Sequence, residues 1–125
     1  MTFEEGTKVV TVVDDDELMR DSLMGLLKAA GLPAKVFASA KDFLESGFQH
    51  RTACLIADVR MPEISGLELL ARLNAENCRI PTIFITAHGD AKMRIEALRE
   101  GAVEFLTKPF DIAVLLQHVR AAIEN

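Results

Sequence analysis

The sequence predicts an α/β domain in which an open, five-stranded parallel sheet is covered by helices on both faces. Short apolar runs alternate with amphipathic segments five times, as expected of repeated strand–helix units in a (βα)5 arrangement. Several runs are almost continuous in Val, Ile, Leu and Ala, which is typical of strands buried on both faces of a parallel sheet. The chain has 125 residues, the length of a single domain. We therefore expect one doubly wound domain over residues 1–125, with its core at about 8–123.

The second of the five predicted strands has the weakest pattern. Pro33 directly precedes it, and proline is tolerated only at the start of a strand or at the edge of a sheet. In such sheets the functional crevice lies at the carboxyl ends of the strands. The predicted strands are, in order, Val9–Val13, Ala34–Phe37, Ala53–Ala57, Thr82–Ile85 and Ala102–Leu106.

The first two predicted helices have clear start and stop signals. Apolar residues recur along one face from 19 to 30, with Asp16 as a fitting N-cap and Gly31 as a stop. Ser39 can cap a shorter second helix, which we expect to end near Gly47.

The third and fifth predicted helices are both amphipathic. The third runs from Ser65 through Asn74 and carries Leu67, Leu70 and Ala71 on one face. The fifth has the clearest pattern of all, and its apolar positions are Ile112, Leu115, Leu116, Val119 and Ile123.

The fourth predicted helix, about 91 to 100, has the thinnest apolar stripe. Ile95 and Leu98 face one way, the remaining face is charged, and Gly101 is placed to end the helix. A helix with so small a hydrophobic anchor can shift at low cost.

Carboxylates gather where two of the predicted strands end. Asp14, Asp15 and Asp16 directly follow the first strand, and Asp58 follows the third. Like charges 4 Å apart repel by roughly 4 kcal/mol at an effective dielectric of 20, so a cation would offset them. Carboxylate oxygens suit a hard divalent cation, and the arrangement predicts a magnesium site.

Other polar residues follow the neighbouring strands. Thr86 stands at the end of the fourth strand and Lys108 after the fifth. Each residue alone has a simpler explanation: helix capping for the three aspartates, a turn for Asp58, a strand-end hydroxyl or a solvated charge for the others. Their joint occurrence at four strand ends favours a functional site.

Four segments then indicate a family. VVDDDELMR, LIADVRMPEISGLELL, PTIFITAHGD and GAVEFLTKPF resemble those of receiver domains of bacterial two-component response regulators. The resemblance runs from Lys8 to Ala122 and depends on the ordered set of acids, hydroxyl and Lys-Pro at strand ends. It implies the flavodoxin-like strand order 2-1-3-4-5.

The resemblance also implies a phosphoacceptor and its metal. Asp58 matches the aspartate that accepts a phosphoryl group from a histidine kinase. The family's Mg²⁺ ligands map onto Asp15, Asp58 and the backbone carbonyl of Arg60, with Asp14 acting through water. Such a chain is a signalling domain, rather than an enzyme acting on an external substrate.

Two residues match the family's conformational switch. Thr86 matches the hydroxyl that moves toward the phosphoryl group, and Phe105 matches an aromatic residue that then fills the emptied space from the exposed side. Plain core packing is the competing explanation for Phe105. Lys108 matches the lysine that pairs with the phosphoryl oxygens, and its bond to Pro109 is often cis in the family.

Three residues near the crevice are implied to modulate the chemistry. Arg60 and His88 stand where side chains influence access of the hydrolytic water, so we expect them to tune the lifetime of the phosphoaspartate. Ala87 is small and leaves the pocket open to the donor.

The expected partners follow from the same resemblance. They are a histidine kinase and an output domain or protein that reads the fourth helix, fifth strand and fifth helix, with a homodimer as a possible result of phosphorylation. The string at 86–90 is similar to receivers joined to LuxR-type DNA-binding domains. Two alternatives stay open: a haloacid-dehalogenase-type phosphatase, disfavoured by Arg60 two residues after Asp58, and a binding module that works without phosphorylation.

Composition limits the surroundings of the chain. The net charge is −5 and the basic residues are scattered, so we expect no direct nucleic-acid binding. No apolar stretch approaches a membrane span. Cys54 and Cys78 show no metal-binding or redox spacing. We therefore expect a cytoplasmic protein.

Overall fold

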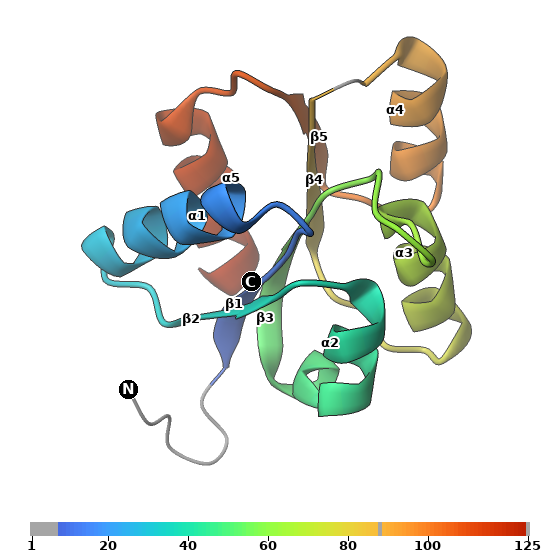
Figure 1. Ribbon diagram of the computed structural model, residues 1–125, viewed down its shortest axis with the longest axis horizontal. Helices are drawn as coiled ribbons and strands as arrows, with labels where there is room; N and C mark the ends of the chain where they lie inside the picture. The colour runs from blue at the N-terminus through green and yellow to red at the C-terminus, as the bar shows by residue number, and fades with distance from the viewer. Residues whose placement is uncertain (1–7, 88, 125) are drawn as a thin grey trace.

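The computed structural model describes residues 8–87 and 89–124, and it contains the predicted five-stranded parallel sheet (Figure 1). The strand order is β2-β1-β3-β4-β5 and every neighbouring pair is parallel, which confirms the predicted order. The strands are β1 (Val9–Val13), β2 (Ala34–Phe37), β3 (Thr52–Ala57), β4 (Thr82–Thr86) and β5 (Glu104–Thr107).

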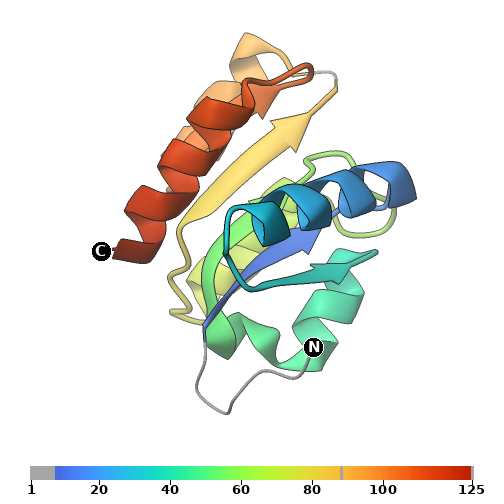
Figure 2. The same ribbon diagram turned by 90° about the vertical axis from the view of Figure 1, so that its left-hand side faces the viewer.

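Five α-helices cover the sheet from both sides (Figures 1 and 2). Two of them, α1 and α5, lie on one face, and α2, α3 and α4 lie on the other. Each face has its own core cluster of buried aliphatic and aromatic side chains. The helices are α1 (Glu17–Ala29), α2 (Ala40–Ser46), α3 (Gly66–Ala75), α4 (Ala91–Arg99) and α5 (Ile112–Glu124). No helix in 8–87 or 89–124 is long and apolar enough to cross a membrane.

The predicted caps are present. Asp16 accepts a hydrogen bond from the Leu18 amide at 3.0 Å, and Ser39 accepts one from the Asp42 amide at 3.1 Å. Gly47 follows α2 with φ +79°, a left-handed conformation that favours glycine. Local hydrogen-bonding signals therefore place the helix ends well.

The buried face of α3 differs from the prediction. Ala71 is exposed and Leu67 is only half-buried, whereas Leu69, Leu70 and Leu73 are buried. With several apolar residues in one short helix, more than one apolar stripe fits the sequence. The contact of the first turn of α3 with the sheet selects the stripe that is actually buried.

The thin anchor of α4 is confirmed, but through other residues. Ile95 and Leu98 are 54% and 41% exposed, and Ala97 is the fully buried position of this helix. A small alanine fits where α4 approaches the sheet closely, which leaves the larger side chains outside. In α5, Leu115 and Val119 are buried as predicted, while both ends of the apolar stripe are exposed.

The element bounds also differ in places from the prediction. A short 3-10 helix, Phe48–Arg51, lies before β3 and was not predicted. The fifth strand begins at Glu104 rather than at Ala102.

Candidate functional site

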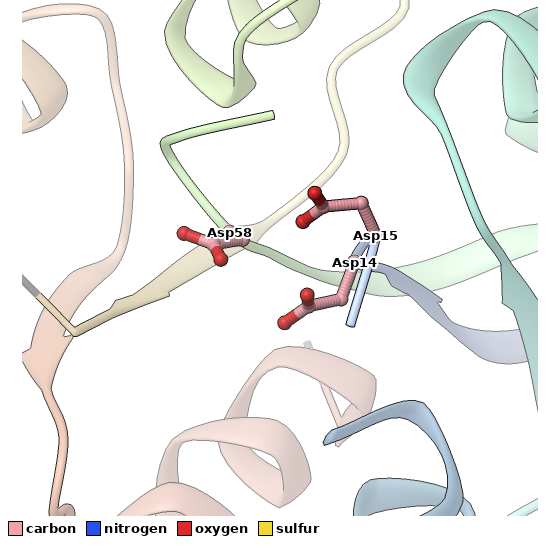
Figure 3. A group of neighbouring side chains, drawn as sticks. All are labelled: Asp14, Asp15 and Asp58. Carbon is pink, nitrogen blue, oxygen red and sulfur yellow. The ribbon is translucent and has the colours of Figure 1, made fainter. Parts of the chain in front are cut away.

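Three carboxylates meet at the carboxyl ends of β1 and β3 (Figure 3). These strands are neighbours, with Val13 opposite Ala57, so the residues that follow them are brought together. One carboxylate oxygen from each of Asp14, Asp15 and Asp58 lies within 4.8 Å of the other two. The third aspartate of the first run, Asp16, instead caps α1.

Backbone hydrogen bonds fix this arrangement. The Asp58 amide donates to the carbonyl of Val13 at 3.1 Å, and the Asp14 amide donates to the carbonyl of Phe37 at 3.1 Å. The Asp16 amide donates to Oδ1 of Asp14 at 2.9 Å. The acids are therefore held by the sheet and by the turn into α1, rather than by side-chain packing alone.

Burial makes two of these acids weaker. Asp14 is 2% exposed and Asp58 is 9% exposed, whereas Asp15 lies in solvent. Burial raises the pKa of Asp14 from 3.8 to about 6, against a lowering by the Asp16 amide. Burial also raises the pKa of Asp58, and the charge of Asp15 adds to this, while the Arg60 amide, Lys108 and Thr86 lower it.

One lysine faces two of the acids. Nζ of Lys108 lies 4.0 Å from Oδ2 of Asp14 and 4.0 Å from Oδ2 of Asp58. The Lys108 amide donates to the Thr86 carbonyl at 2.9 Å, and the bond from Lys108 to Pro109 is cis. Among residues 8–87 and 89–124, one ammonium group thus lies beside two members of the three-carboxylate cluster.

The donor set fits a hard divalent cation. All the clustered side-chain donors are carboxylate oxygens, and their combined charge exceeds that of the one lysine. The raised pKa values of Asp14 and Asp58, caused mainly by burial, show that ionising these two side chains is unfavourable in the folded protein. Mg²⁺ prefers oxygen ligands and needs few carboxylates, so the three aspartates suit it.

The raised pKa of Asp14 has a consequence for stability. Its pKa is 3.8 when unfolded and about 6 when folded, so the folded state binds more protons between these values. We expect the free energy of unfolding without Mg²⁺ to fall as the pH rises from about 4 to about 6, by about 1–3 kcal/mol. Urea unfolding of the wild type and of Asp14→Asn across this range measures the effect.

The expected outcome is a shallower pH slope for Asp14→Asn, because its side chain does not ionise. Asp21→Asn, at an exposed position of α1, is the matched control and should keep the wild-type slope. Equal slopes for Asp14→Asn and the wild type would contradict the assignment.

The predicted switch residues stand on adjacent strands. Thr86 ends β4 and is buried, and Phe105 lies on β5, 3% exposed. A Cβ on Gly89 would lie 2.6 Å from Cε1 of Phe105, so the glycine packs directly on this ring. In this structure the Phe105 ring lies on the buried side, and its movement on phosphorylation stays a prediction. A phenyl ring has no hydroxyl to keep near water, and burial in the core is its favourable state.

The modulating positions are only partly described. The Arg60 amide donates to Oδ1 of Asp58 at 3.2 Å, and the Arg60 side chain is exposed. Ala87 is exposed at the end of β4. His88 lies outside the described residues.

Two residues that shape the site were missed in the sequence. A Cβ on Gly66 would overlap the Asp58 carbonyl oxygen and would lie 2.9 Å from Cε1 of Phe84, so only glycine lets α3 begin this close to the acceptor loop. The sequence signal that could have identified Gly66 is its position directly after Ser65, the N-cap of α3. Arg20 donates to the Asp14 carbonyl, and nothing in its spacing indicated that contact.

Comparisons with known proteins agree with this geometry. Residues 10–120 match the family model described as response regulator receiver domain. The chain is 46% identical over 114 residues to the transcriptional regulatory protein FixJ of Azorhizobium caulinodans. This alignment covers 91% of this chain and 54% of that protein. It is 47% identical over 123 residues to nodulation protein W of Bradyrhizobium diazoefficiens, covering 98% of this chain and 54% of that protein. The chain thus spans about half the length of these curated relatives.

Solved structures show the same fold. A crystal structure of FixJ-N superposes with a TM-score of 0.84 at 38% identity, covering 100% of this chain and 97% of that one. The response regulator StyR gives a TM-score of 0.86 at 42% identity, covering 94% of this chain and 60% of that one. The chain, with its acidic cluster at the predicted sheet edge, belongs to the family of response regulator receiver domains.

Proposed function

We propose that Asp58 is the phosphoacceptor of this receiver domain. Its carboxylate lies at the end of β3, next to Lys108 and within the acidic cluster. In the reaction, an Asp58 oxygen attacks the phosphorus of a phosphohistidine or small donor, the bond to the donor breaks, and an acyl phosphate forms. The single observation that carries the proposal is the convergence of the three carboxylates and the lysine from β1, β3 and β5.

We propose that Mg²⁺ is held by Asp15, Asp58 and the Arg60 backbone carbonyl, with Asp14 acting through water. When bound, Mg²⁺ offsets the repulsion between the carboxylate and the phosphoryl oxygens. Lys108 contributes a second positive charge toward the phosphoryl oxygens.

Thr86 is assigned to the switch, because its buried hydroxyl lies beside Asp58 at the end of the next strand. Phosphorylation then biases the position of α4, whose buried anchor is small. We also assign Phe105, which is buried against Gly89 in the β4–α4 connection, to this switch. Arg60, Ala87 and His88 are assigned to setting the lifetime of the phosphorylated form.

The partners in this proposal are a histidine kinase and an output domain or protein that reads the α4-β5-α5 face. Residues 1–125 form one receiver domain, and phosphorylation can promote a homodimer. Because the named relatives include a transcriptional regulatory protein, we assign the domain to transcriptional control through a LuxR-type output domain. The phosphatase and the phosphorylation-independent module are not favoured, because the family match spans nearly the whole chain.

Intact mass spectrometry after incubation with acetyl phosphate tests the proposal. We expect the wild type to gain one phosphoryl group only in the presence of Mg²⁺, and Asp58→Asn to gain none, because an amide cannot form the acyl phosphate. Following the same mass after donor removal, in the wild type and in Arg60→Ala, measures the lifetime assigned to the modulating residues.

Asp42→Asn is the matched control, since this exposed aspartate on α2 is not a member of the cluster. It should be phosphorylated like the wild type. Phosphorylation of Asp58→Asn to the wild-type extent would overturn the assignment of the acceptor.

A further inference from the structure

Arg20 makes an unusual contact from the start of α1. It lies in the first turns of this helix, and its Nη1 donates to the backbone carbonyl oxygen of Asp14 at 2.9 Å. The side chain therefore reaches back over the connection between β1 and α1. Arg20 is partly buried in this position.

The contact completes a set of bonds around the turn that contains the acids. On one side, Oδ1 of Asp14 accepts the Asp16 amide, and on the other the Asp14 carbonyl accepts Arg20. Asp15 lies between these fixed points and is exposed. The backbone of this turn therefore sets where the Asp15 carboxylate lies.

Helix electrostatics argue against an incidental surface role for Arg20. The N-terminal end of a helix carries partial positive charge, so cations are favoured at the other end, where Lys28 lies in α1. Here a guanidinium group sits at the unfavourable end, beside the acids that follow β1. The hydrogen bond to the Asp14 carbonyl gives the side chain a defined geometry.

We propose that Arg20 is a positioning residue for the cation site. By holding the Asp14 carbonyl, it fixes the turn so that the Asp15 carboxylate converges with those of Asp14 and Asp58. The proposal rests on the proposed function of this cluster as a Mg²⁺ site, and adds a residue that acts through Asp14 rather than by binding Mg²⁺ or the phosphoryl group itself.

Titration of the unphosphorylated protein with Mg²⁺ by calorimetry tests the inference. Arg20→Met keeps an apolar stem and removes the donors, and we expect it to weaken Mg²⁺ binding about tenfold. Arg20→Lys keeps the charge but not the planar geometry, so its affinity for Mg²⁺ should fall between those of the wild type and Arg20→Met. Arg72→Met, at an exposed position of α3, makes the same change in net charge and should stay within about twofold of the wild type.

A readout without metal separates positioning from general damage. Hydrogen exchange of the Asp16 amide, measured by NMR in the metal-free protein, should become faster in Arg20→Met, because the turn loses the hydrogen bond from Arg20 to the Asp14 carbonyl. The exchange of buried β3 amides should stay unchanged.

Failure of the Arg20 inference and failure of the proposed function give different results. If Arg20→Met binds Mg²⁺ as tightly as the wild type, the positioning role is overturned while the proposed function stands. If Arg72→Met loses as much affinity as Arg20→Met, net charge explains the effect and the inference is also overturned. If the wild type itself does not bind Mg²⁺, the proposed function fails, and this inference fails with it.

Discussion

Replacing Lys108 with Met is expected to slow the phosphorylation of Asp58 by at least tenfold. In the part of the chain that the structure describes, its ammonium group is the only one placed 4.0 Å from both Asp14 and Asp58. Charges at that distance interact with roughly 4 kcal/mol at an effective dielectric of 20. Retaining about a third to a half of this in the transition state corresponds to about ten- to thirtyfold in rate.

The rate of mass gain with acetyl phosphate at saturating Mg²⁺ measures this effect. Lys92→Met is the control, because it removes the same charge from an exposed position on α4. An equal rate for Lys108→Met and Lys92→Met would show that Lys108 does not act on the phosphoryl group, and would remove it from the proposed site.

Gly66→Ala has the second large expected effect, on stability. The new Cβ would overlap the Asp58 carbonyl oxygen and would lie 3.0 Å from Cα of Val59, and both are backbone atoms that cannot rotate away. We expect the free energy of unfolding to fall by about 1–3 kcal/mol, as for other overpacked sites. Because α3 must shift from the acceptor loop, Mg²⁺ binding should weaken as well.

Gly25→Ala provides the matched control for the same chemical change. A Cβ at Gly25 meets nothing within 4 Å, and the residue lies in the interior of α1. This variant should be more stable than the wild type by about 0.5–1 kcal/mol, because alanine is the better helix former. Urea unfolding of both variants measures the contrast. A Gly66→Ala protein as stable as the wild type would contradict the close approach of α3.

The strands of the sheet were predictable because strand signals and strand-end residues are local in the sequence, whereas the strand order came from the family resemblance. The caps Asp16 and Ser39 were predictable for the same reason, since each bonds to an amide two or three residues away. The meeting of Asp15 with Asp58 followed from the rule that parallel strands end at one edge. The family resemblance added the expected role of each residue.

The remaining features depend on tertiary packing, which a single sequence does not display. Whether Leu69 or Ala71 of α3 faces the hydrophobic core depends on how the first turn of that helix meets the sheet. The burial of Phe105 depends on space beside Gly89, a residue sixteen positions away. The contact from Arg20 to Asp14 joins a helix to a turn through one long side chain, which has no spacing signature.

The most direct test of the central claim identifies the phosphorylated residue itself. Borohydride reduces an acyl phosphate of aspartate to homoserine, so treating the acetyl-phosphate-modified protein and sequencing its peptides by mass spectrometry locates the acceptor. We predict homoserine at position 58 alone, and only in samples that contained Mg²⁺. Homoserine at Asp14 or Asp15, or a Mg²⁺-independent modification elsewhere, would contradict the account.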